Sequence, residues 1–138
     1  MLLAIALFAA CILGYVLRRR ARTRWRRVAL SELRAVARRY ATTSDGHRLA
    51  AEVSALLRRF VLSVQPRAPA AGLSGSAWID LLDALSPRAR LDSATRRALL
   101  EAPYRPATPL DGAALIAACE RWLRRATLTS TPAARAET

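Results

Sequence analysis

The first seventeen residues of the chain carry no charged side chain. Residues 1–17 are apolar apart from Gly14 and Tyr15, and three arginines follow at once. A helix of this length spans about 26 Å, and snorkelling arginines can make up the difference from a hydrocarbon core of about 30 Å. The pattern predicts a transmembrane helix over residues 1–17. A signal peptide and a buried core helix are the alternatives, but a signal peptide carries its positive charge before the apolar run.

The pattern after the arginines has the period of a helix. Between Trp25 and Tyr40 the apolar residues recur at helical spacing, and no proline interrupts residues 2–41. We therefore expect the membrane span to run directly into the first helix of the following domain. A polar turn at residues 42–46 ends this helix, and Ser44 or Asp45 is positioned to cap the next one.

Four further helices follow from the same signals. The clearest apolar stripe runs from Leu49 to Val64 and ends before Pro66. Shorter stripes follow over residues 74–85, 93–100 and 111–125, each after a serine or an aspartate and separated by proline-containing segments. Strand-like alternation is absent from the sequence, which predicts an all-α fold: a transmembrane helix running into a small cytoplasmic bundle of four or five helices over residues 28–126. Residues 127–138 are predicted to be a disordered tail.

Charge sets the expected orientation. All 23 basic residues are arginine, against 10 acidic residues, for a net charge of +13, and this pairing of charge with 53% hydrophobic residues excludes an ordinary soluble enzyme domain and a disordered basic tail. Because arginine-rich flanks stay in the cytoplasm, the run in residues 18–27 predicts an N-terminus outside and a domain inside. Contact with anionic lipid of the inner leaflet is expected for the arginines of this run: Arg18, Arg19, Arg20, Arg22, Arg24, Arg26 and Arg27.

Few residues suggest chemistry. Asp80 and Asp83 share a helix face, but two carboxylates are too few for a metal site, and an arginine partner is the simpler interpretation. His47 is the only histidine and is expected at the surface, while Cys11 and Cys119 are interpreted as apolar fillers. We therefore predict no catalytic residue, no cofactor, no metal and no small-molecule substrate.

Two arginine-containing patterns suggest binding. Tyr104 and Arg105 lie between Pro103 and Pro106, and two prolines that stiffen a loop would project these side chains toward a protein partner. The alternative is that Tyr104 packs beneath the last helix. Arginine doublets also recur through residues 38–125, and an aligned set of them would suit nucleic acid, although the chain has no recognisable reading helix.

The motifs "ALSELR", "LLRRFVLSVQPR", "LSGSAWIDLLDAL" and "LLEAPYRP" follow the apolar span and the arginine run. In this combination the chain resembles a family of small bacterial single-span membrane proteins of unknown function. Members of that family are encoded beside MoxR-type AAA+ ATPases and von Willebrand factor A domain proteins of aerotolerance-type gene clusters. The resemblance extends from about Leu2 to Arg125.

The resemblance implies partners but no reaction, since no catalytic residue is established for the family. It favours a non-enzymatic adaptor or assembly factor in the bacterial inner membrane, whose cytoplasmic helices dock an AAA+ ATPase or a von Willebrand factor A protein. The alternative is a membrane-tethered nucleic-acid-binding module that uses the arginine doublets.

Overall fold

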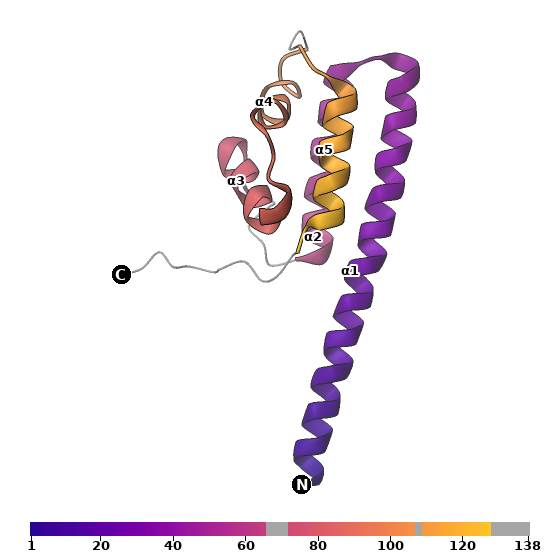
Figure 1. Ribbon diagram of the computed structural model, residues 1–138, viewed down its shortest axis with the longest axis vertical. Helices are drawn as coiled ribbons and strands as arrows, with labels where there is room; N and C mark the ends of the chain where they lie inside the picture. Colours follow the sequence, from indigo (N-terminus) through magenta and orange to yellow (C-terminus); the bar gives the residue numbers. More distant parts are fainter. Residues whose placement is uncertain (66–71, 107–108, 128–138) are drawn as a thin grey trace, which may run out of the picture.

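The apolar N-terminal segment and the first helix of the bundle are one continuous α-helix. In the computed structural model, which describes residues 1–65, 72–106 and 109–127, α1 spans Leu2–Thr43. Its N-terminal part projects beyond all other elements (Figure 1), and the most apolar window of the helix has no buried residue. By length and composition α1 can cross a membrane.

The remaining elements fold back beside the C-terminal part of α1. They are α2 (Gly46–Val64), α3 (Gly75–Leu85), the short 3-10 helix η2 (Pro87–Ala89), α4 (Ser93–Glu101) and α5 (Gly112–Arg125). Every regular element in the described residues is helical, which confirms the all-α prediction. Only η2 differs from the expected pattern, because Ser86 and Pro87 start a 3-10 turn where the sequence predicts only the end of a helix. Most of the predicted tail lies outside the described residues.

Aspartates begin three of the helices. Asp45, Asp92 and Asp111 precede α2, α4 and α5, and each carboxylate accepts a hydrogen bond from the backbone N–H three residues further on, at 2.7 to 3.1 Å. These bonds satisfy N–H groups that the first turn of a helix leaves unpaired. Ser44 instead adopts a left-handed conformation at the end of α1. Ser74 precedes α3 but forms no side-chain capping bond.

The core lies where α2 and α5 meet α1 on one side and α3 and α4 on the other (Figure 1). Trp122 is fully buried at its centre. The indole N–H of Trp122 donates to the carbonyl of Leu82 at 2.9 Å, and its ring meets Phe60 edge to face with centroids 6.0 Å apart. The tryptophan thus joins α5 to both α2 and α3 while leaving no polar atom of its own unpaired.

Helix α1 contributes to this core only through its C-terminal part. Ala29, Leu33 and Val36 are buried, as the helical pattern predicts. Trp25 and Val28, expected on the same face, are about two-fifths exposed. They lie at the edge of α1 and line a shallow groove beside α2, because the other helices do not cover α1 on that side.

The end of the bundle far from Met1 is fixed by two close contacts. The ring of Tyr40 occupies the space that a side chain at Gly112 would need, so the start of α5 sits directly on the end of α1. Nδ1 of His47 donates to the carbonyl of Ala102 at 2.6 Å. His47 is therefore half-buried and joins α2 to α4, whereas the sequence predicts a surface position.

Candidate anion-binding cleft at the base of the bundle

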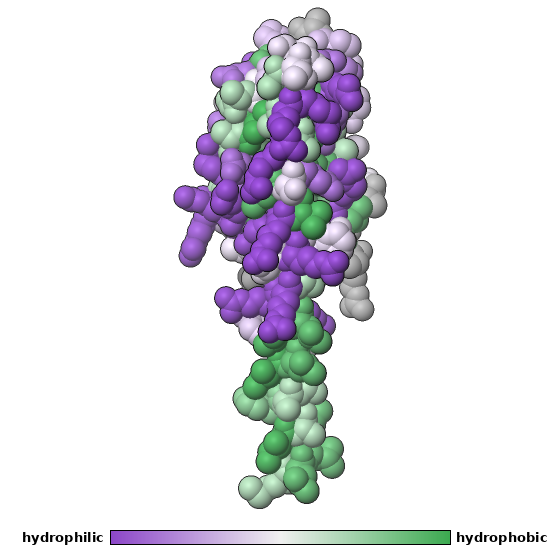
Figure 2. Space-filling view, turned by 90° about the vertical axis from the view of Figure 1, so that its right-hand side faces the viewer, coloured by the Kyte–Doolittle hydropathy of each residue, from purple (hydrophilic) through white to green (hydrophobic). Residues whose placement is uncertain are grey.

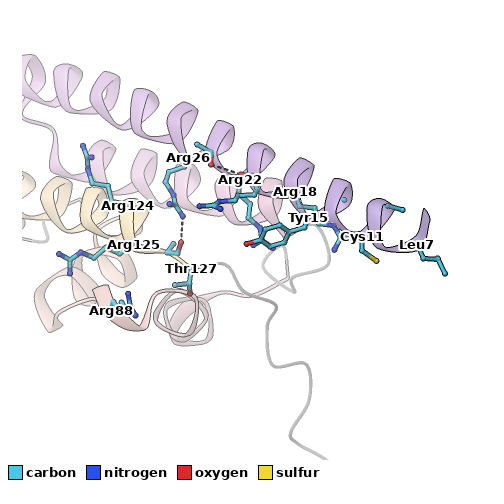
Figure 3. A pocket seen from close by; sticks show the side chains of 15 residues that line it. Leu7, Cys11, Tyr15, Arg18, Arg22, Arg26, Arg88, Arg124, Arg125 and Thr127 are labelled. Atoms are coloured by element: carbon cyan, nitrogen blue, oxygen red, sulfur yellow. Dashed lines mark hydrogen bonds between the residues drawn. The ribbon is translucent and has the colours of Figure 1, made fainter. Parts of the chain in front are cut away.

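A cleft of about 1230 Å³ separates the N-terminal half of α1 from the underside of the bundle. We call it the basal cleft. One wall is the face of α1 from Leu7 to Arg26, and the other is formed by η2 and the end of α5 (Figure 3). Arginines from all three elements line it: Arg18, Arg19, Arg22, Arg26, Arg88, Arg124 and Arg125.

The α1 wall follows from helical spacing. Positions 15, 18, 19, 22 and 26 are three or four residues apart, so their side chains share one face of the helix, and that face is turned toward the bundle (Figure 3). Of the seven arginines predicted to contact lipid, four line the cleft. The other three, Arg20, Arg24 and Arg27, are exposed and do not line it.

The opposite wall comes from residues far away in the sequence. Helix α5 runs toward the base and ends there at Arg125, and the backbone N–H of Thr127 donates to the carbonyl of Leu85 at 3.0 Å. This bond holds the end of α5 against the end of α3, next to η2. The contact places Arg88, Arg124 and Arg125 opposite the arginine run of α1. The arginine run of α1 does not by itself predict that these three residues lie opposite it. They reach that position only because α5 runs back antiparallel to α1.

Arg26 connects the two walls. Its guanidinium donates to the carbonyl of Ala126 at 2.6 Å, across 100 residues of sequence. The carbonyls at the C-terminal end of a helix carry partial negative charge and attract cations. Nε of Arg26 is buried and has no hydrogen-bond partner among the described residues. The contact closes the top of the cleft and fixes the distance between α1 and α5.

The basal cleft has a strongly positive lining. It contains no acidic side chain. Arg124 pairs with Glu120 at 2.8 Å, and Arg26 is engaged by the carbonyl of Ala126. The other five lining arginines form no ion pair with any described residue: Arg18, Arg19, Arg22, Arg88 and Arg125. Like charges that share a cleft repel one another, and this repulsion is relieved when an anion binds between them. The arrangement is therefore suited to an anionic ligand.

The hydrophobicity of the surface changes at the same level. Figure 2 shows hydrophilic side chains gathered over the bundle, ending where the apolar N-terminal part of α1 begins. Several large side chains of this part are about two-thirds exposed or more, among them Leu2, Leu3, Phe8 and Tyr15. Exposure of this many large apolar side chains along one helix favours an apolar environment around it. The basal cleft thus lies at the boundary between the apolar and charged parts of the molecule.

The second predicted binding feature lies at the other end of the bundle. Tyr104 is 77% exposed and Arg105 is exposed beside it, so the alternative in which Tyr104 packs beneath the last helix is wrong. Both backbone N–H groups donate to the carbonyl of Glu101, at 3.0 and 2.9 Å. These bonds form a tight turn that directs the two side chains away from the core.

Most arginine doublets of the bundle are partly engaged within the protein. Arg39 pairs with Glu52 at 3.1 Å and Arg59 with Glu32 at 3.1 Å. The guanidinium of Arg58 lies 4.4 Å from the ring centroid of Trp78 and donates to the carbonyl of Leu73. Arg96 pairs with Asp80 and Asp83. At least one arginine of each of these three doublets is therefore less available to bind nucleic acid.

The remaining candidates for chemistry have structural roles. Asp80 and Asp83 both bind Arg96, as the simpler interpretation predicts. Burial raises the pKa of the Cys119 thiol to about 12, so this cysteine stays protonated and unreactive at neutral pH. Cys11 lies in the projecting part of α1, and no group of three or more potential metal ligands occurs within the described residues.

Residues 1–125 match the model of a family described as "Domain of unknown function (DUF4381)". The chain belongs to this family. The match covers the apolar part of α1, the arginine run and the whole bundle, so the DUF4381 domain comprises both walls of the basal cleft. No curated protein and no solved structure matches the chain significantly.

Proposed function

We propose that this DUF4381 protein is a non-enzymatic adaptor anchored in the bacterial inner membrane by α1, with its helical bundle in the cytoplasm. The orientation is supported by the arginines that follow the apolar part of α1, because such flanks remain on the cytoplasmic side. No residue in the most apolar window of α1 is buried, as expected for a lipid-facing helix.

Tyr104 carries the docking part of the proposal. It is the one large hydrophobic side chain of the described bundle after α1 that is strongly exposed, and Arg105 lies next to it. Tyrosine and arginine are the types that most often dominate binding energy at interfaces. The pair lies near the contact between His47 and Ala102, at the end of the bundle far from the membrane. A cytoplasmic partner can reach it there.

The expected partner is a MoxR-type AAA+ ATPase or a von Willebrand factor A domain protein. This expectation comes from the gene neighbours of the family that the sequence resembles. The arginine doublets support the rival nucleic-acid function less well, since several of them pair with acids or aromatic rings of the protein itself.

Photo-crosslinking in cells tests the docking surface. A photoreactive amino acid in place of Tyr104 should crosslink the ATPase or the von Willebrand factor A protein, and the Y104A/R105A double variant should reduce copurification of that partner at least about tenfold. The matched control is R97A, which removes an exposed arginine of α4 and should leave copurification unchanged. Equal recovery with Y104A/R105A and R97A would refute docking at this surface.

Two further measurements test the anchor and the rival function. A C-terminal reporter that is active only in the periplasm should be silent, and an active reporter would overturn the orientation. DNA retention that falls steeply with salt and depends on the arginine doublets would favour the nucleic-acid function instead.

A further inference from the structure

We propose that the basal cleft is a specific site for an anionic phospholipid whose headgroup carries two phosphodiester groups. The proposal rests on the membrane anchor of the proposed function, but not on the docking of a partner at Tyr104. It goes beyond a general attraction of the arginine run to the membrane, because it assigns the binding to one face of α1 and to arginines of the bundle.

Along α1 the lining of the cleft changes from apolar to positively charged, in the same order as the acyl chains and the headgroup of a phospholipid. Leu7, Ala10, Cys11 and Gly14 come first, then Tyr15, then the arginines. Acyl chains would lie along the apolar part, Tyr15 would lie at the interface, and phosphates would meet the guanidinium groups. At Gly14 no other part of the molecule lies within 4 Å of where a side chain would begin, so an acyl chain has space there. A free phosphate ion would leave this apolar wall without a role.

The charges of the cleft exceed what one phosphodiester can balance. Apart from Arg26, which binds the carbonyl of Ala126, five lining arginines form no ion pair with any described residue. They come from opposite walls: three from α1, Arg88 from η2 and Arg125 from α5. A single phosphodiester carries one negative charge and binds one or two guanidinium groups in the bidentate geometry that arginine favours. Two phosphodiesters joined by a short linker can bind both walls at once.

The binding site is fixed rather than formed by loose side chains. The bond from Arg26 to the carbonyl of Ala126 ties the walls together at one end, and the bond from Thr127 to Leu85 holds the end of α5 beside η2. A cleft with a set width discriminates between headgroups, whereas a diffuse positive surface responds only to total lipid charge.

Two charge-matched triple variants test the proposal in the full-length protein. R22Q/R88Q/R125Q removes three cleft arginines, and R20Q/R24Q/R27Q removes three arginines of the same run that lie outside the cleft. Protein in detergent micelles is mixed with a diphosphate phospholipid or with a monophosphate anionic phospholipid at equal phosphate, and retained lipid is counted by native mass spectrometry.

The wild type and R20Q/R24Q/R27Q should retain one diphosphate lipid in preference to the monophosphate lipid. R22Q/R88Q/R125Q should retain the diphosphate lipid at least about tenfold less than the wild type. Equal losses in both triples, or equal retention of the two lipids at equal phosphate, would overturn the proposal. Displacement of the lipid by millimolar inorganic phosphate would overturn the assignment to a lipid and leave a phosphate site.

A third variant shows whether weaker lipid binding comes from the lost guanidinium groups and not from unfolding. R22K/R88K/R125K keeps the charge but lacks the bidentate fork of arginine, and it should bind the diphosphate lipid several-fold more weakly than the wild type while melting at the same temperature. Unchanged binding by this variant would contradict recognition by paired guanidinium groups. Release of the protein from membranes by alkaline carbonate would instead refute the anchor, and with it the proposed function.

Discussion

At the scale of single residues, Asp83 shows how the bundle uses its few acids. It is the one carboxylate of the described residues that is buried. One of its oxygens accepts a hydrogen bond from the backbone N–H of Leu91 at 2.9 Å, and the other binds Arg96. Asp80 binds the same arginine at 2.9 Å but is 68% exposed. The two aspartates thus share a partner and differ in burial.

This difference gives a prediction. D83A should lower the free energy of unfolding by about 3 kcal/mol, because it leaves a buried N–H and a half-buried guanidinium without their acceptor. D80A should lower it by about 0.5 kcal/mol, since an exposed ion pair contributes little in water. Urea denaturation in detergent, followed by circular dichroism, measures both values. Similar losses would show that burial does not decide the strength of this network.

At the scale of the elements, the aspartate caps define where the helices begin. Hydrogen bonds with Thr95 lower the pKa of Asp92, and the nearby charge of Arg121 acts in the same direction. Because its pKa in the folded state lies below the unfolded value of about 3.9, the contribution of Asp92 to stability is complete above that pH and disappears as the pH falls through the folded pKa. Ser74 makes no equivalent bond.

The caps therefore predict an effect that depends on pH. D92A should reduce the free energy of unfolding by about 1 kcal/mol at neutral pH, and its difference from the wild type should shrink below about pH 4. S74A provides the contrast and should change stability by only a few tenths of a kcal/mol. Denaturation curves at both pH values measure these differences. A D92A penalty that persists unchanged in acid would exclude the ionised carboxylate as its source.

The helices could be predicted from the sequence because their signals are local. Apolar spacing, aspartate caps and prolines act within a few residues, and they placed the continuous α1 and the start of α5 correctly. The basal cleft could not be predicted in the same way. It depends on the contact between Arg26 and Ala126, which requires the path of the whole chain between them. The spacing of Arg18, Arg22 and Arg26 is the one signal for it in the sequence, since residues four apart lie on a single face of a helix.

At the scale of the whole molecule, the apolar part of α1 is structurally separate from the helical bundle. The first buried residue of α1 is Ala29, so the core contains nothing from the preceding 28 residues. The DUF4381 match nevertheless includes both parts. The apolar stretch that could span a membrane and the stretch that packs into the core therefore lie in one helix but do not overlap.

This separation predicts that the apolar part of α1 can be exchanged without loss of stability. Replacing residues 2–14 by an unrelated apolar sequence of the same length should leave the melting temperature of the bundle in detergent unchanged, because none of these side chains is buried. L33A, within the same helix, should cost about 3 kcal/mol through the cavity it opens. A large loss of stability in the exchanged protein would mean that the anchor contributes to the bundle.

A helix without a break also acts as a spacer. From Arg18 to Thr43 it extends about 38 Å. Under the proposed anchoring, with α1 along the membrane normal, the surface around Tyr104 would stand at a set height above the bilayer. Each added residue would lift that surface by about 1.5 Å and turn it by about 100°. Under the proposed docking at Tyr104, a partner that is itself held in the membrane would have to match both the height and the direction of this surface.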